Sequence, residues 1–536
     1  MKYLLSIAIG PVQDFIAAAR RCRDLWFGSH LLSEVSKAAA ASLHDQGAAL
    51  VFPTPIAHSD LEPESPFTVA NKLLSVVETD DIQGVVDHAR DAAKERLRLV
   101  AQLERRRLRG AEIDWDRYYV QLEGILEFYA AWTPYGQHRE SHRRVEELSA
   151  GRKALRAFPF YEGIAGEPKS SLDGMREHVV ARRSNRLFES NLKDNEWLDA
   201  IGVVKRFGGE YKSFDSTVDI AALPYVQGCD RKYPEMMQRY RRFLRDKNLP
   251  PETYALLYPH ESRQIFEDEE VEDPELEAIR QALEHEPRPP YYAYLIGDGD
   301  RMGGAIGGIH DLETHRKFSR QLSLFAAKAK ETIELASHRG CAIYCGGDDV
   351  VALLPLHTAL SCARAVNAAF RDTMTSFNVT FSAGLVVAHA LEPLSEVREW
   401  ARNAESAAKK KGGRDALCIS VHPRSGGSVT VWDKWDQLPK LVEDIVELYT
   451  ARKLSYGVAH DLRNLAERTR GWEEIRGAVP GMARAIVSKK ERNEDAERLM
   501  RDHVRDPARG WAELETFYKT LLVARPFARA RKEAGE

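Results

Sequence analysis

Two β-prone runs that end in aspartates constrain this chain more than any other feature. Residues 291–297 are a predicted strand that stops at Asp298 and Asp300. Residues 341–354 are a predicted hairpin with Gly346-Gly347-Asp348-Asp349 at its turn. Paired glycines allow a tight turn with positive φ and keep side chains away from an approaching ligand. The pattern therefore predicts two strand ends that can meet a ligand.

The aspartates at these strand ends predict a cation site. If the strands are neighbours, Asp298, Asp348 and Asp349 converge at one end of a sheet, and three carboxylates at one point repel one another unless a cation lies between them. Hard oxygen ligands in an open site suit Mg²⁺ or Mn²⁺, as in two-metal phosphoryl or nucleotidyl transfer. A plain hairpin turn is the alternative, because a Gly-Gly-Asp-Asp turn alone is often no more than that.

The segments that follow favour the cation site. A predicted helix at 359–374, a strand at 379–388, a helix that reaches Lys409 and a strand at 416–421 complete the order β-α-β-hairpin-α-β-α-β. This order resembles the palm domain of GGDEF-type nucleotide cyclases and family B polymerases. The Ser-Ala-Gly strand and the Ala-Lys-x-x-Gly helix end resemble the cyclases. The likeness implies that Lys409 lies near a triphosphate, whereas without it Lys409 would be a solvated lysine in a Lys-Lys-Lys run.

A nucleotide-binding group is predicted around these aspartates. Gly346 and Gly347 allow the backbone to approach phosphate oxygens, and Lys409 supplies a point charge to them. Asp300 is expected to orient the neighbouring aspartate or the turn rather than to hold metal. Ser382 is assigned to the base or ribose pocket, and a buried strand serine is the alternative that stays open.

The composition is that of an ordinary globular protein. The 536 residues are enough for several cores, and the formal net charge of −4 excludes a strongly basic coat for nucleic acid. Nothing approaches the run of about 18 apolar residues that a membrane span needs. The six cysteines are scattered and form no Cys-x-x-Cys pair. A reduced, cytoplasmic protein without membrane contact is predicted.

The N-terminal part repeats the beginning of the palm pattern. Residues 2–9 are a predicted strand, residues 14–25 and 31–44 are predicted helices, and residues 126–132 are a predicted closing strand. Residues 82–109 are a charged helix whose exposed face is solvated or contacts RNA phosphate. Because this part contains neither Asp-x-Asp nor Gly-Gly-Asp-Asp, it is expected to hold no metal and to serve as a partner for the active palm.

Five motifs in order resemble one protein family. They are similar to the large subunit of type III CRISPR–Cas effector complexes (the Cas-ten family, Cmr branch), and the likeness spans about residues 1–425. One such motif can arise by chance, but five in the correct order indicate the family. The matching segments are residues 9–16 (Ile-Gly-Pro-Val-Gln-Asp-Phe-Ile) with 19–33, residues 71–73, residues 198–206 with 214–221, residues 293–303, and the turn at 346–349.

The resemblance also predicts two absences. Family members often carry a zinc-binding cysteine cluster, but residues 158–173 contain no cysteine, so no structural zinc is predicted and aromatic side chains are expected to pack there. Many members have an HD nuclease domain before the first palm strand. Here that strand begins at residue 2, so no HD nuclease activity is expected. His44-Asp45, His310-Asp311 and His460-Asp461 are interpreted as isolated surface dipeptides, because no further ligands for a metal pair are placed near them.

The predicted fold class is α+β, with two ferredoxin-like palm domains, a helical insert and a helical C-terminal domain. An acidic, proline-rich linker at 267–290 is expected to lead into the catalytic palm. The C-terminal helices are expected, from the resemblance, to dock on small helical subunits. The predicted domains are 1–150 (first palm, no acidic site), 151–285 (insert), 286–425 (catalytic palm) and 426–536 (helical domain).

The resemblance implies an enzyme of antiviral defence. ATP would be converted to cyclic oligoadenylate second messengers at two Mg²⁺ or Mn²⁺ ions held by Asp298, Asp348 and Asp349, once a guide CRISPR RNA pairs with target RNA in the assembled complex. The implied partners are the other type III subunits and both RNAs. Three alternatives stay open: a diguanylate cyclase, although the last acid is Asp rather than Glu; a catalytically silent scaffold subunit; and conjugation of ATP to another adenosine-containing metabolite.

Overall fold

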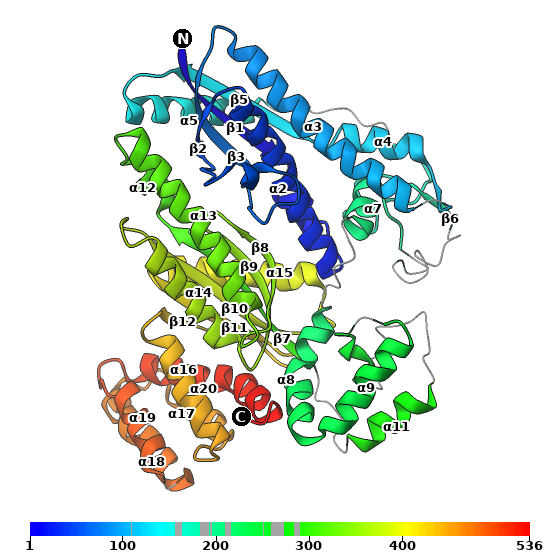
Figure 1. Cartoon of the computed structure of the whole chain (residues 1–536). Coiled ribbons are helices and arrows are strands. Elements are labelled where there is room, and N and C mark those ends of the chain that lie inside the picture. Colours follow the sequence, from blue (N-terminus) through cyan, green and yellow to red (C-terminus); the bar gives the residue numbers. More distant parts are fainter. Residues whose placement is uncertain are drawn as a thin grey trace.

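The computed structural model describes residues 1–536 except 109, 156–162, 183–191, 193–195, 209–215, 250, 259–272, 284–289 and 492. Two large β-sheets, each packed between helices, lie one above the other, and a group of helices lies below the second of them (Figure 1). A third sheet consists of two short strands, β4 and β6. This arrangement confirms the predicted α+β fold class. Part of the region in which zinc loss is expected, residues 158–162, lies outside the described residues.

The first sheet is antiparallel, with the strand order β2-β3-β1-β5. Strand β1, one of the two inner strands, is buried from residue 4 onward because helices cover both faces of the sheet. Leu5 and Ile7 face α2 and α3, whereas Leu4 faces Val145 of α5 on the other side. The elements are β1 (Lys2–Gly10), β2 (Ala49–Phe52), β3 (Lys72–Glu78), β5 (Glu127–Pro134), α2 (Cys22–Asp45), α3 (Ile82–Arg107) and α5 (His138–Ala154).

The helix predicted over 14–25 is wrong, because the chain breaks between α1 (Gln13–Ala17) and α2. The cause is the carboxylate of Asp24, which accepts the backbone N–H groups of Arg20 and Arg21 at 3.1 and 3.0 Å and so starts a new helix. Arg206 of α7 (Ala200–Phe207) holds the same carboxylate through hydrogen bonds of 2.6 and 2.9 Å. The second predicted helix is the C-terminal part of α2.

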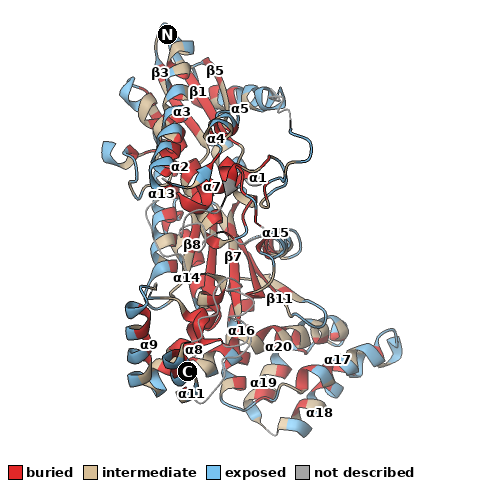
Figure 2. Cartoon of the chain, turned by 90° about the vertical axis from the view of Figure 1, so that its right-hand side faces the viewer, coloured by how far each residue is buried: buried red, intermediate tan, exposed pale blue. Residues whose placement is uncertain are grey.

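The second sheet has the order β12-β11-β10-β7-β9-β8, with β10 and β11 parallel and the other neighbours antiparallel. Leu295 and Leu385 point to α13 and α14, while Tyr294 and Val386 point to α15 and α8, so the strands are buried on both faces (Figure 2). The elements are β7 (Tyr291–Asp300), β8 (Cys341–Gly346), β9 (Asp349–Pro355), β10 (Thr380–His389), β11 (Ala416–His422), β12 (Val429–Lys434), α8 (Thr217–Lys232), α13 (Leu312–Glu334), α14 (Ala359–Thr373) and α15 (Leu394–Lys410).

The linker predicted over 267–290 contains a helix in its described part. Pro274 occupies the first turn, Asp273 caps it, and Leu276 and Ile279 are buried against α9 and its neighbours. Apolar spacing and a cap therefore outweigh the acidic, proline-rich composition. The other short elements are η1 (His58–Leu61), β4 (Glu112–Ile113), α4 (Trp115–Glu123), β6 (Val180–Arg182), α9 (Pro234–Asp246), η2 (Tyr254–Leu257), α11 (Pro274–Ala282) and α12 (Met302–Gly307).

The C-terminal region is helical and returns to the second sheet. Its last helix packs against α16, α17 and α8, and Gln227 of α8 donates a hydrogen bond of 3.0 Å to Glu536. In the described part of the chain no helix has the length and apolar character that crossing a membrane requires. The helices are α16 (Leu438–Thr450), α17 (Val458–Thr469), η3 (Glu473–Ala478), α18 (Val479–Glu491), α19 (Glu494–His503) and α20 (Gly510–Glu533).

Candidate functional site

The hairpin turn lies beside the end of β7. Strands β7 and β9 pair through Gly297 and Val350, so the next residues of β7, Asp298 and Gly299, lie against the turn. A Cβ atom at position 299 would lie only 2.9 Å from the Cβ of Asp348. Glycine between the two β7 aspartates therefore permits the close approach that brings the turn to the strand end.

The two glycines of the turn have separate steric roles. Gly346 pairs with Asp349 across the hairpin, which leaves Gly347 and Asp348 as the turn residues. Gly347 has a φ of 62°, a left-handed conformation that side chains disfavour. A side chain at position 346 would collide with the hydroxyl of Tyr344. The predicted hairpin and its glycines thus form as the sequence indicates.

The two aspartates of the turn have raised pKa values because burial and neighbouring carboxylates disfavour their charge. Desolvation and, next, the charge of Asp298 raise the pKa of Asp348 to about 7. Desolvation and the charge of Asp348 raise the pKa of Asp349 well above its usual range, and a hydrogen bond with Asp298 adds to this effect. Carboxyls that hold protons near neutral pH are characteristic of functional sites. The described geometry therefore contains an excess of acid at one sheet end.

Lys409 supplies positive charge beside these aspartates. Its ammonium group forms an ion pair with Asp298 and a second one, of 2.5 Å, with Glu405 one turn earlier on α15. Burial alone would lower the pKa of Lys409, but the hydrogen bonds to these two carboxylates outweigh it and raise the pKa. The ligand oxygens of Asp298 and the turn aspartates do not form a group whose members all lie within 4.8 Å of one another. A metal ion at Asp298 would therefore have to replace this lysine.

The side chains of Asp300 and Ser382 form hydrogen bonds with each other inside the fold. The Ser382 hydroxyl donates to Asp300 at 2.8 and 2.9 Å, and Thr380 and the backbone N–H of Asp415 donate to the same carboxylate at 2.8 and 2.9 Å. Asp300 is 1% exposed and Ser382 is fully buried. Both side chains fix the end of β7 to β10 and to the loop after α15. This arrangement gives both side chains a supporting position behind the turn, and their predicted contact with a nucleotide stays a prediction.

The first sheet approaches the turn through one strand and one connection. A Cβ atom at Gly347 would lie 3.9 Å from the ring of Phe52, the last residue of β2. Arg398 of α15 donates a hydrogen bond of 2.8 Å to the carbonyl of Ala17, at the end of α1. The helix that carries Lys409 is therefore attached to the first sheet's region as well.

Glu405 and Arg398 were missed from the sequence. Glu405 lies four residues before Lys409 on one helix, and an acid and a base at this spacing form side-chain pairs, so this signal was available. Arg398 gives no local signal, because its partner is a backbone carbonyl distant in the chain. Sequence patterns find pairs within one helix more readily than contacts between domains.

Two family models match the chain over the regions of the two sheets. Residues 291–418 match "Cas10/Cmr2, second palm domain", and residues 4–101 match "CRISPR-associated protein Cmr2, N-terminal". The matches define the class: a protein with a palm domain of the Cas10/Cmr2 type.

A curated relative narrows the class to a family. The CRISPR system Cmr subunit Cmr2 of Pyrococcus furiosus is 24% identical over 563 residues, which cover 80% of this chain and 63% of the relative. The chain thus spans less than two thirds of that relative's length. Together with the two domain matches, this similarity supports a Cmr-type large subunit of the Cas10/Cmr2 family. The resemblance inferred from the five motifs is confirmed.

Solved structures share the fold at low identity. The apo state of a type III-B Cmr-beta complex contains a chain that is 13% identical, with a TM-score of 0.63, covering 91% of this chain and 77% of that one. The form of this complex bound to cognate target RNA contains a chain that is 13% identical, with a TM-score of 0.61, covering 87% of this chain and 76% of that one. A Csm1–Csm4 cassette in complex with cA4 contains a chain that is 11% identical, with a TM-score of 0.53, covering 98% of this chain and 70% of that one.

Proposed function

We propose that the second palm of this chain joins ATP molecules into cyclic oligoadenylate as part of a type III CRISPR effector complex. The observation that carries the proposal is that Asp298, at the end of β7, lies beside the turn that carries Asp348 and Asp349, two carboxyls with raised pKa. Chains of similar fold support it, since Csm1–Csm4 cassettes are described in complex with cA4 and with one ATP.

The proposed chemistry uses the three aspartates as metal ligands. Two bound Mg²⁺ or Mn²⁺ ions would lower the pKa of an acceptor ribose hydroxyl and neutralise the leaving pyrophosphate. Asp298, Asp348 and Asp349 would hold the ions, with Asp348 and Asp349 in their ionised forms. Lys409 releases Asp298 and pairs with phosphate oxygens of ATP, as a point charge on a flexible stem can. The absence of a side chain at Gly347 lets the phosphates approach the turn.

Each cycle of the proposed reaction forms one phosphodiester bond. The 3′-oxygen of one adenosine attacks the α-phosphorus of the next ATP, the bond from that phosphorus to pyrophosphate breaks, and the hydroxyl proton passes to solvent. Ring closure repeats the same step within one oligomer. Asp300 and Ser382 keep the end of β7 in register with β10, so that Asp298 stays in place while the substrates change.

The partners belong to the same proposal. The structures of similar fold are a Cmr-beta complex bound to cognate target RNA and a Csm1–Csm4 subcomplex of a type III-A interference complex. By this analogy, the chain assembles with the other type III subunits and a guide CRISPR RNA, and target RNA starts synthesis. The division into domains at 150, 285 and 425 is part of the proposal too, with the helical C-terminal region facing the small subunits.

The test is product formation from labelled ATP in the presence of Mg²⁺ or Mn²⁺. The chain is assayed alone and within its guide-RNA complex with target RNA, and products are resolved by mass spectrometry. We expect a series of cyclic adenylates that disappears in the variant carrying Asp348→Ala and Asp349→Ala, with a loss of at least about 10²–10³-fold. Asp372→Ala, an exposed aspartate on α14, is the matched control and should keep full activity.

Other outcomes separate the remaining alternatives. ATP binding without product in the activated complex would contradict synthesis and favour a scaffold subunit. Products whose masses fit one adenylate joined to a second metabolite would favour conjugation to another adenosine-containing molecule. Products made from GTP in preference to ATP would favour the diguanylate cyclase.

A further inference from the structure

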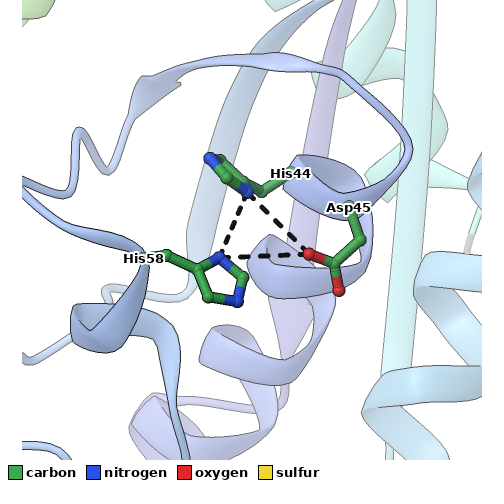
Figure 3. A group of neighbouring side chains, drawn as sticks. All are labelled: His44, Asp45 and His58. Atoms are coloured by element: carbon green, nitrogen blue, oxygen red, sulfur yellow. Dashed lines mark hydrogen bonds and ion pairs between the residues drawn. The ribbon is translucent and has the colours of Figure 1, made fainter.

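Three metal-binding side chains meet on the surface of the first palm. His44 and Asp45 end α2, and His58 begins η1 in the connection between β2 and β3. The Nδ1 atoms of the two histidines are 3.3 Å apart, and they lie 3.8 and 4.0 Å from one carboxylate oxygen of Asp45 (Figure 3). We propose that this cluster binds a Zn²⁺ ion. The sequence interpretation of His44-Asp45 as an isolated dipeptide missed His58, which a loop brings back to the helix end.

The distances fit tetrahedral coordination. Bonds from zinc to imidazole nitrogen are about 2.0–2.1 Å, and tetrahedral geometry then places two such ligand atoms about 3.3 Å apart. The two Nδ1 atoms already have this separation. The carboxylate oxygen has to move inward by about 0.5 Å, which a small rotation of the exposed Asp45 side chain provides. In the described part of the chain, this is the group of three potential ligands whose atoms all lie within 4.8 Å of one another.

The donor set selects the ion. Two imidazoles and one carboxylate suit Zn²⁺ better than Mg²⁺, which prefers oxygen ligands in an octahedron. With no cation, one Nδ1 must carry a proton toward the other, whereas a metal ion accepts both lone pairs. The cluster also lies at the C-terminus of a long helix, where the backbone dipole favours positive charge. Three protein ligands leave a fourth position for water.

The backbone on both sides holds the ligands in place. His44 follows Leu43, which is buried against the first sheet, and the helix continues to Asp45. On the other side, Asp60 accepts the backbone N–H groups of Ile56 and Ala57 at 2.7 and 3.0 Å and fixes the start of η1. The ion would therefore bind to a largely formed site, and ordering the ligands would cost little of the binding free energy.

The site would fasten the connection after β2 to the end of α2. This connection begins at Phe52, the residue whose ring lies next to the Gly347 turn of the second palm. All three ligand side chains are 44–62% exposed, so the ion can enter from solvent. A bound ion would thus stabilise the first palm by cross-linking two of its segments, independently of any reaction at the second palm.

The test is Zn²⁺ titration of the metal-free full chain by calorimetry, with Asp348→Ala and Asp349→Ala as background so that the turn cannot compete. We expect one Zn²⁺ per chain at the cluster and at least about tenfold weaker binding in His44→Ala and in His58→Ala. His88→Ala is the matched control, because His88 is an exposed neighbour on α3 that bonds to Gln46 and lies outside the cluster. Its affinity should equal that of the background.

A second measurement reads the coordination directly. Co²⁺ added in place of Zn²⁺ should give the intense visible bands of a tetrahedral ion, and these should be lost in both histidine variants while His88→Ala keeps them. Asp45→Asn should weaken binding less than the histidine changes, because the amide oxygen remains a ligand. Equal Zn²⁺ binding by the background protein and by a variant lacking both His44 and His58, or a cobalt spectrum of octahedral type, would overturn the proposal.

Discussion

In the first sheet the strands follow the order β2-β3-β1-β5, and in the second sheet β8-β9-β7-β10 repeats this order strand for strand, antiparallel in both. The difference lies in one connection. β8 and β9 are joined by the short turn that carries Asp348, whereas β2 and β3 are joined by a long segment that contains η1. Related backbones therefore carry a tight turn with two aspartates in one sheet and a long loop in the other.

Acidic residues near the two sheets are held in opposite electrostatic states. Burial favours the neutral form of Asp24, but Arg206 outweighs it and lowers the pKa of this carboxyl. Arg206 is itself shared with Glu196 through hydrogen bonds of 3.0 and 2.8 Å. At the second sheet, Asp348 has no comparable partner and its pKa is raised. A buried carboxylate that is paired with an arginine, such as Asp24, stabilises the fold. A buried carboxyl without such a partner, such as Asp348, can bind a cation.

The largest expected effect compares these two aspartates directly. Asp24→Asn should lower the free energy of unfolding by about 3–5 kcal/mol, because it leaves the buried charge of Arg206 underpaired. Asp348→Asn should cause no loss in metal-free protein above pH 7, since the carboxyl has a raised pKa in the folded chain and its ionisation there opposes folding. Chemical denaturation with a chelator present measures both. Equal losses would contradict the comparison.

The next effect concerns the contact between the two palms. His315 of α13 lies 3.0 Å from His138 of α5, with His142, Lys72 and Asp311 around them. Burial and the neighbouring histidines lower the pKa of His315 to about 3. The unfolded chain therefore binds a proton below about pH 6.5 that the folded chain excludes, and stability falls as the pH decreases.

Between pH 6.5 and 5, the exclusion of this proton from His315 should lower the free energy of unfolding by about 1.5–2 kcal/mol. Thermal unfolding across this range measures it. In His315→Asn, whose side chain does not titrate, the decrease with acidity should be smaller by that amount. Parallel pH profiles of the two proteins would show that this histidine does not control the contact.

The smallest expected effect tests whether Asp300 only holds the end of β7 in place or also contacts the nucleotide. Thr380→Val removes one of the hydrogen bonds to Asp300 and should cost about 1 kcal/mol in the free energy of unfolding. Ser382 and the backbone of Asp415 still hold the carboxylate, so the affinity for ATP should stay unchanged in equilibrium binding. Weaker ATP binding at unchanged stability would place Asp300 in contact with the nucleotide.

Local signals predicted the second palm well. The runs before Asp298 and around Gly346-Gly347 have strand composition and turn residues of fixed geometry, so β7 and the hairpin could be located within a few residues. Helices α14 and α15 follow from apolar spacing. The break between α1 and α2 could not be found in this way, because the cap at Asp24 depends on Arg206, which lies far along the chain.

The parts of the site that sequence could not give depend on register between distant strands. Ser382 reaches Asp300 because β10 pairs with β7 with Thr380 opposite Asp300, a register that local patterns do not contain. The pair of Lys409 with Asp298 depends on the same assembly. His58 joins His44 only because the connection after β2 turns back, and an isolated histidine in a loop gives no sign of this.

Helix α15 has a mechanical consequence. Near one end Arg398 is bonded to the carbonyl of Ala17, and near the other Lys409 is bonded to Asp298, about 16 Å away along one continuous rod. A helix of this length transmits displacement rather than absorbing it. A displacement of the connection between α1 and α2 along the helix axis would therefore change the position of Lys409 relative to Asp298.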